Sequence, residues 1–318
     1  MPAPPVETRP LPLQTALLIE QLLNGIQFGV MLFLMAAGLT LIFGVMGLIN
    51  LAHGSLYMIG AFACASAAAA TGSFWLGLAA SLAAAAGAGA LVEIVVIRRL
   101  YDRDHLDQVL ATFALILIFS EGTRWLFGSF PLYLNIPPLL AGAVPLPGGA
   151  LYPLYRLAII GVGLAVAVGL FLLISRTRLG MRIRAGESDR EMIGALGVDI
   201  RTLYTIVFAL GAALAGLAGA MVGALQSVQV GMGEPVLILA FVVIVIGGIG
   251  SIKGAFIGAL LVGVVDTMGR FLLPQALAAI IGPSQAASIG AAVASMLIYI
   301  LMALVLAVRP KGLFAAGA

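Results

Sequence analysis

Charge is scarce in this chain. Only 9% of its 318 residues are Asp, Glu, Lys or Arg, while 62% are hydrophobic. Soluble domains carry about 25% charged residues, and a surface with so few charges would not keep a soluble fold in water. The composition therefore excludes an ordinary soluble protein and predicts one that crosses a membrane several times.

Cysteine and histidine are almost absent as well. The single cysteine, Cys64, excludes an intramolecular disulfide, and the presence of only two histidines, His53 and His105, argues against a zinc site. Neither a G-x-x-x-x-G-K-[ST] phosphate loop nor a G-x-S-x-G nucleophile elbow occurs. We therefore expect no catalytic residue, no metal site and no cofactor in this chain.

What the sequence does contain is long apolar runs. A membrane-spanning helix needs roughly 20 apolar residues, and eight or nine runs meet this length. They lie at 16–43, 55–72, 75–97, 108–127, 154–174, 203–226, 235–250, 255–273 and 288–308. The prediction is an all-α, polytopic transmembrane helical bundle that forms a single domain over 1–318. Its first half would cover about 12–150 and its second half about 151–318.

Twelve of the 16 basic residues fall into four groups that flank these runs. The groups are Arg98, Arg99 and Arg103; Arg176, Arg178, Arg182, Arg184, Arg190 and Arg201; Lys253; and Arg309 with Lys311. If each run crosses the membrane once, all four groups lie on one side, which the positive-inside rule makes cytoplasmic. The N-terminus is then outside. Because membrane topology accounts for the basic residues, they predict no nucleic-acid partner.

Two Gly-rich stretches, 44–54 and 247–254, interrupt the apolar pattern in opposite halves of the chain. Paired interruptions of this kind point to a transport pathway, because irregular backbone at membrane depth survives only against protein or a wet cavity. The candidate pathway residues are Asn50, His53, Gly54, Gly247, Gly248, Gly250 and Gln226. For Asn50 and His53 two interpretations stay open: they line the path, or they bond backbone groups that the turn leaves free.

Acidic residues inside the apolar runs are costly and often functional, and the candidates are Glu20, Glu93, Glu121 and Asp266. Three of them have an Arg within reach along the helix: Glu93 before Arg98, Glu121 before Arg124, and Asp266 before Arg270. We expect these to be structural ion pairs. Uncharged Gln27, Thr40, Gln226 and Gln229 could contact a solute without a large burial cost.

The loop 176–201 is the most highly charged part of the chain, with 10 of its charged residues. Ser188 and Glu191 form a capping box at the start of a short helix, and Gly197 supplies its left-handed stop. The apolar residues would share one face: Met192, Ile193 and Leu196. A helix of about two turns is unstable alone in water, so we expect it to dock on a partner or to lie back on the membrane interface or the bundle.

The uncharged loop 129–153 lies on the opposite side and holds six of the 15 prolines. Proline fixes φ and removes a backbone donor, so an extended, rigid loop is predicted. It is either a plain connector or part of a surface that receives an external partner.

Four stretches of the sequence are similar to those of a known protein family. The chain resembles a permease subunit of the branched-chain amino acid ABC transporter family, and the resemblance covers nearly the whole chain. The stretches are LTLIFG at 39–44 continuing to INLAHGSLYM at 49–58, the loop segment 184–199, GGIGSIKGA at 247–255, and RPKGLF at 309–314.

The resemblance implies a bacterial inner-membrane importer surrounded by membrane lipid. An external, periplasmic or extracellular, solute-binding protein would deliver a solute to this chain and to a second, paralogous permease subunit. Two ATPase subunits, which bind ATP and Mg²⁺, would dock on the coupling helix of the loop 176–201. The residues implied in coupling are Glu187, Ser188, Asp189, Arg190, Glu191, Met192, Ile193, Leu196 and Gly197.

The implied solute is a branched-chain or other apolar amino acid, although members of the family also carry urea, short amides and aromatic or other carboxylic acids. Two rival classes stay open. A self-sufficient secondary transporter and a passive channel for a solute such as urea or an amide would both work without any ATPase.

Overall fold

The computed structural model describes residues 11–147 and 149–314. In the first half of the chain the helices are α1 Leu11–Met46, α2 His53–Thr71, α3 Phe74–Val95 and α4 His105–Phe127, with a 3-10 turn η1 at Ile97–Arg99. In the second half they are α5 Leu154–Arg176, α6 Arg178–Ser188, α7 Arg190–Ala195, α8 Ile200–Gly223, α9 Gly233–Gly247, α10 Ile252–Ile281 and α11 Pro283–Val308.

The nine predicted apolar runs all form helices. Within the described residues, eight helices are long and apolar enough to cross a membrane, and α9 is shorter, with 15 residues. The prediction of eight or nine spans in an all-α bundle is therefore confirmed, and the chain is a multi-pass membrane protein.

One boundary differs clearly from the prediction. The run 255–273 stops before Pro274, yet α10 continues through this proline to Ile281. Proline removes one helical hydrogen bond, and membrane helices tolerate the loss when a neighbouring helix supports them. Here α11 gives that support, because Gly290 lies directly against Pro274.

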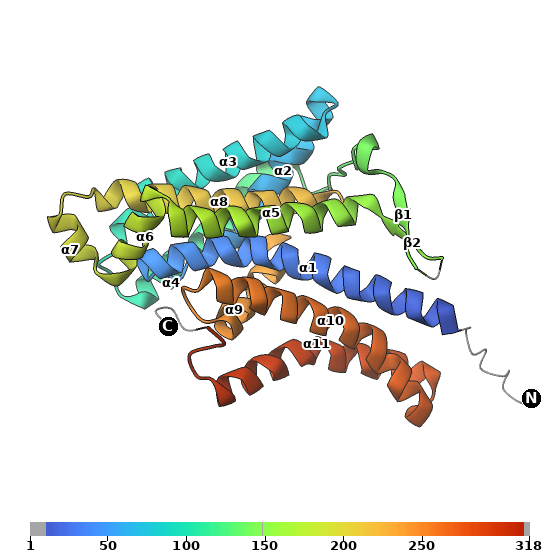
Figure 1. Ribbon diagram of the computed structural model, residues 1–318. Coiled ribbons are helices and arrows are strands. Elements are labelled where there is room, and N and C mark those ends of the chain that lie inside the picture. The colour runs from blue at the N-terminus through green and yellow to red at the C-terminus, as the bar shows by residue number, and fades with distance from the viewer. Residues whose placement is uncertain (1–10, 148, 315–318) are drawn as a thin grey trace, which may run out of the picture.

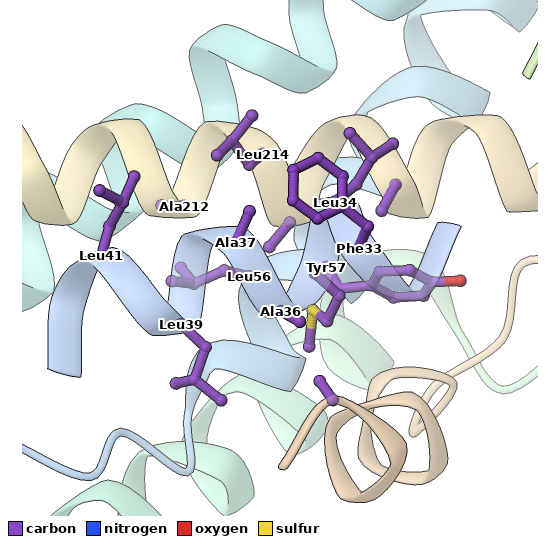
Figure 2. Packing of buried hydrophobic residues seen from close by; sticks show 14 of the residues in the cluster. Phe33, Leu34, Ala36, Ala37, Leu39, Leu41, Leu56, Tyr57, Ala212 and Leu214 are labelled. Atoms are coloured by element: carbon purple, nitrogen blue, oxygen red, sulfur yellow. The ribbon is translucent and has the colours of Figure 1, made fainter. Parts of the chain in front are cut away.

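The long helix α1 is the central element. It runs between a layer formed by α2, α3, α5 and α8 and a layer formed by α9, α10 and α11 (Figure 1). Its 36 residues make it roughly 54 Å long, which exceeds the roughly 30 Å hydrocarbon core of a bilayer. Figure 2 shows side chains of α1 packed with Leu56 and Tyr57 of α2 and with Ala212 and Leu214 of α8. The labelled residues of α1 are Phe33, Leu34, Ala36, Ala37, Leu39 and Leu41.

Small residues bring these helices close together. A Cβ atom on Gly29 of α1 would lie 2.7 Å from the carbonyl oxygen of Ala259 and 2.8 Å from the Cα of Leu260 on α10. Only glycine permits such a close approach, as is typical of helices that pack in membranes. Cys64 is a free thiol buried in this core, in keeping with a packing residue.

The three predicted ion pairs are confirmed. Arg98 holds the buried Glu93 through two hydrogen bonds of 3.2 and 3.0 Å, and Thr205 of α8 donates a third of 2.6 Å. Arg270 bonds Asp266 at 3.0 Å, and Arg124 bonds Glu121 at 2.5 Å on the surface. The Glu93 cluster ties the end of α3 to the start of α8.

The loop 129–153 contains a 3-10 turn η2 at Pro138–Leu140 and an antiparallel pair of strands, β1 Ala143–Pro145 and β2 Leu151–Pro153. It lies at the end of the bundle opposite α6, α7 and the C-terminal region (Figure 1). We call the end with α6 and α7 the basic end, because Arg184, Lys253 and Arg309 line one cavity there. We call the other end the outer end.

Candidate coupling surface and solute path

The charged loop folds as two short helices, α6 and α7, that meet at a sharp turn. The predicted capping box is wrong in one respect: Ser188 is the last residue of α6, and Asp189 is the N-cap of α7. The Asp189 backbone is extended, and its Oδ1 accepts hydrogen bonds from the amides of Glu191 at 3.0 Å and Met192 at 2.9 Å. A charged acceptor at this position also complements the positive end of the helix.

The predicted stop of this helix is confirmed. Gly197 has a φ of +86°, and its amide donates to the carbonyl of Gly194 at 3.0 Å. The amide of Val198 donates to the carbonyl of Ile193 at 3.3 Å. Together the two hydrogen bonds form a Schellman-type helix ending. Two residues later, the Asp199 side chain accepts from the amides of Arg201 and Thr202 and caps α8.

The sequence predicted that the apolar residues of the short helix share one face, and this prediction is wrong. Met192 and Leu196 are exposed, with 59% and 77% of their surface in solvent, whereas Ile193 is 6% exposed. Residues four apart are neighbours on a helix, and the next position points about 100° away. Ile193 therefore fastens α7 to the bundle, and Met192 and Leu196 form the outward apolar patch.

The two Gly-rich interruptions meet beside the loop 176–201. A Cβ atom on Gly44 would lie 3.4 Å from the Cα of Gly250 and 3.6 Å from Oε1 of Glu187. Glu187 stands in a cavity of 1030 Å³ at the basic end, which Thr40, Lys253 and Arg309 also line. Partial burial there raises the pKa of Glu187 above its ordinary value. Glu187 of the loop therefore lies beside Gly44 and lines the same cavity as Gly250.

The C-terminal stretch lies on the second interruption. The amides of Leu313 and Phe314 donate to the carbonyls of Ile246 and Gly247, both at 2.9 Å. Gly248, with a φ of +105°, lies against the backbone of Phe314. These hydrogen bonds satisfy carbonyl groups that the end of α9 leaves free, so Gly247 and Gly248 are packed under the tail.

In the first interruption, Asn50 and His53 are both completely buried. Oδ1 of Asn50 accepts a hydrogen bond of 3.0 Å from the amide of Ala52, so this side chain does bond a backbone group in the turn. The His53 ring lies beside Gly38 of α1. Because Gly38 precedes the end of α1 by two turns, residues 47–52 have turned back along α1; we call them the inner re-entrant segment.

A second re-entrant segment, residues 224–232, is one that the sequence analysis missed. It follows α8 at the outer end and turns back beside α2, where the amide of Gly231 lies 3.4 Å from the sulfur of Met58. The two segments lead to helices whose N-termini meet: a Cβ atom on Gly54 would lie 2.9 Å from the carbonyl oxygen of Gly233. We call 224–232 the outer re-entrant segment.

The predicted pathway residues are thus divided among different surroundings. Gln226 is exposed in a cavity of 220 Å³ in the outer half, and Gly250 lines the cavity at the basic end. The other predicted residues line neither of these two cavities: Asn50, His53, Gly54, Gly247 and Gly248. Residues that the sequence did not single out, Tyr57 and Arg156, line the outer cavity together with Gln226.

Comparisons with known proteins agree with this architecture. A family model described as "Branched-chain amino acid transport system / permease component" matches residues 21–306. The high-affinity branched-chain amino acid transport system permease protein BraD of Pseudomonas aeruginosa is 32% identical over 265 residues, which cover 79% of this chain and 86% of that protein.

Two further relatives extend the comparison. The permease protein LivH of Escherichia coli K12, which is named for the same kind of transport system, is 28% identical over 271 residues, or 80% of this chain and 87% of LivH. The ribose import permease protein RbsC of Escherichia coli K12 is 27% identical over 263 residues, or 77% of this chain and 76% of RbsC. The similarity extends over most of the chain and includes proteins named for two kinds of solute.

Proposed function

The chain belongs to the family of branched-chain amino acid transport system permease components, and we propose that it carries a branched-chain or other apolar amino acid across the bacterial inner membrane. Members of this family are membrane subunits without catalytic activity or a cofactor of their own. The family implies separate ATPase subunits, which bind ATP, and a solute-binding protein. A second, paralogous permease subunit completes the proposed importer.

The observation that supports coupling to an ATPase is the structure of α7. Its N-terminus is capped by Asp189, its end is closed at Gly197, and Ile193 anchors it, so the exposed Met192 and Leu196 are held in a defined position. An apolar patch on a charged loop fits a groove on a partner subunit better than it fits water. Charged Asp189 and Glu191 would set the orientation of that contact.

The path from this contact to the bundle is short. Glu187, the last residue but one of α6, lies beside the place where Gly44 and Gly250 meet. A movement of α7 would therefore reach both interruptions without a long relay. This contact supports the proposal that the ATPase drives the permease through residues 187–197.

The ion pairs argue against three of the acids in the apolar runs as the coupling site of a self-sufficient secondary transporter. A carrier coupled to protons or sodium needs a carboxylate that is free to bind the coupling ion in the path. Glu93, Glu121 and Asp266 each bond an arginine, so these three acids are occupied by structural partners.

The proposal is tested by replacing the exposed leucine of α7. Leu196→Asp places a charge in the proposed contact. Leu139→Asp is the matched control for ATPase recovery in the pull-down, because Leu139 is 75% exposed at the opposite, outer end. We expect the first variant to insert normally but to lose ATPase subunits in a mild-detergent pull-down, and to lose ATP-driven uptake of L-leucine. Normal recovery of the ATPase with Leu196→Asp, or uptake that persists without any ATPase, would refute the coupling proposal.

A further inference from the structure

The outer cavity has the chemistry of a binding site for an amino acid. We propose, building on the proposed function, that it is a solute subsite in which Arg156 binds the carboxylate of the amino acid and the apolar wall receives its side chain. The cavity lies between α1, α2, α5, α8, α9 and the outer re-entrant segment. Its lining residues are Gln27, Phe28, Met31, Leu32, Tyr57, Arg156, Val222, Leu225, Gln226, Met232 and Val236.

The charge of the lining selects for an anionic group. Arg156 is its one cation, and no Asp or Glu is among the described residues that line the cavity. Arg156 is the third residue of α5 and donates from Nη1 to the side-chain oxygen of Asn24 on α1. Within the described part of the chain it forms no ion pair. A guanidinium has five N–H donors, so it can hold Asn24 and still bind a carboxylate.

A second polar group in the cavity has no partner in the protein. The side chain of Tyr57 is 1% exposed, and its hydroxyl has no hydrogen-bond partner among the residues that the structure describes. Figure 2 shows this hydroxyl pointing away from the packed aliphatic side chains. A buried hydroxyl without a partner is costly, and a bound solute would supply one. Gln27 and Gln226 add amide groups for the solute's ammonium.

The remaining wall and the size of the cavity fit a small apolar amino acid. Seven apolar side chains line the space: Phe28, Met31, Leu32, Val222, Leu225, Met232 and Val236. The volume of 220 Å³ is below the roughly 300–1,000 Å³ of pockets for drug-sized ligands. A monosaccharide would leave the apolar wall and the charge of Arg156 without complementary groups, so the lining favours an amino acid over a sugar.

The loop 129–153 is joined to two of the elements that line this cavity, the outer re-entrant segment and α5. Leu132 and Val228 exchange two backbone hydrogen bonds of 2.8 Å, which join the loop to the outer re-entrant segment that carries Gln226. At the other end of the loop, β2 ends at Pro153 and leads directly into the first turn of α5 with Arg156. A solute-binding protein that docked on this loop would therefore act on Gln226 and Arg156 together.

Protection of an introduced cysteine from a thiol reagent tests the subsite directly on the full chain in membranes. The native thiol, Cys64, is buried, so Gln226→Cys provides the exposed target. We expect L-leucine to slow labelling of Gln226→Cys, and leucine amide, which lacks the carboxylate, and ribose to have little effect. Gln229→Cys is the matched control, because Gln229 is exposed on the same segment but does not line the cavity.

Adding Arg156→Gln to Gln226→Cys should raise the half-protecting concentration of L-leucine by about tenfold or more, because a charge-assisted pair is lost; Arg156→Lys should raise it less. Absence of protection by L-leucine, equal protection by leucine amide or ribose, or an unchanged half-protecting concentration in Arg156→Gln would overturn the subsite. The assay requires no ATPase, whereas ATP-driven uptake of L-leucine by the complex tests the proposed function, so the two can fail separately.

Discussion

The two re-entrant segments make the same turn and have opposite surroundings. The inner segment, 47–52, leads into α2 with Asn50 and His53 completely buried. The outer segment, 224–232, leads into α9 with Gln226 and Gln229 exposed. Both have polar residues near a helix N-terminus, yet only the outer segment places one of them in a cavity.

This difference separates two uses of polar residues at a broken helix. In the inner segment the polar group replaces a missing backbone partner, as Asn50 does for Ala52. In the outer segment the polar group remains available to a solute. The structure is therefore closed around the inner segment and hollow beside the outer one, and substitutions in the two segments should affect different properties.

The largest effect is expected where the two segments meet. Gly54→Ala would place a Cβ atom 2.9 Å from the carbonyl oxygen of Gly233 and 3.1 Å from its carbonyl carbon. Because the obstacle is backbone, the helices must separate, and we expect a loss of stability at or above the roughly 1–3 kcal/mol of ordinary overpacking. Thermal unfolding in detergent and the yield of folded protein measure it.

Gly122→Ala is the matched control for this change. Gly122 lies in α4, and a Cβ atom there would meet nothing within 4 Å. We expect unchanged or slightly higher stability, because alanine restricts the unfolded chain. Equal melting temperatures for Gly54→Ala and Gly122→Ala would show that the two helix N-termini are not in the close contact described.

An intermediate effect is expected inside the inner segment. Asn50→Ala removes the acceptor of the Ala52 amide and leaves a buried donor unpaired, which costs about 1–3 kcal/mol. Asn50→Ser should retain part of this stability, since a hydroxyl can cap the same amide. Melting temperature measures the loss, and ATP-driven uptake per folded molecule should remain close to that of the wild type.

Gln226→Ala in the outer segment is the counterpart. Its side chain is exposed in the cavity, so stability should change by no more than about 0.5 kcal/mol, while the KM for uptake of L-leucine should rise. If Asn50→Ala changed uptake and Gln226→Ala changed only stability, the assignment of the two segments would be reversed.

Much of the fold follows from local sequence patterns. Long apolar runs predicted the helices, and the spacing of Glu93, Glu121 and Asp266 from arginine predicted the ion pairs. Local pattern failed where two elements compete for one residue: Ser188 could cap α7, but α6 extends over it and leaves the cap to Asp189. The face of α7 was also wrong, because burial of Ile193 depends on how α7 sits on the bundle.

Only part of the outer cavity could be predicted from the sequence. Gln226 was a candidate, but Tyr57 and Arg156 lie in other helices, and only tertiary packing brings the three together. The cluster of Gln226, Gln229, Gly231, Gly233 and Pro235 between two apolar runs is a signal for the outer re-entrant segment. The predicted runs 203–226 and 235–250 had divided this cluster, so the segment was not recognised.

The smallest expected effect concerns Glu187, the link between the coupling loop and the place where Gly44 and Gly250 meet. Partial burial raises its pKa, so the folded state binds this proton more tightly than the unfolded state does. The resulting stabilisation is present at low pH and is lost as pH rises from the ordinary glutamate pKa of about 4.3 through the raised value. Glu187→Gln is neutral throughout and should remove this dependence.

Melting temperatures of the wild type and Glu187→Gln at pH 4 and pH 8 measure the effect, with Glu191→Gln, an exposed residue of α7, as the control. Relative to Glu187→Gln, the wild type should lose stability on going to pH 8. The difference should be small, since one side of Glu187 remains in solvent, which screens the charge. A wild type that gained stability relative to the variant at pH 8 would mean that Lys253 or Arg309 across the cavity holds the carboxylate, and the coupling loop would then be fastened to the bundle by charge rather than by packing against Gly44.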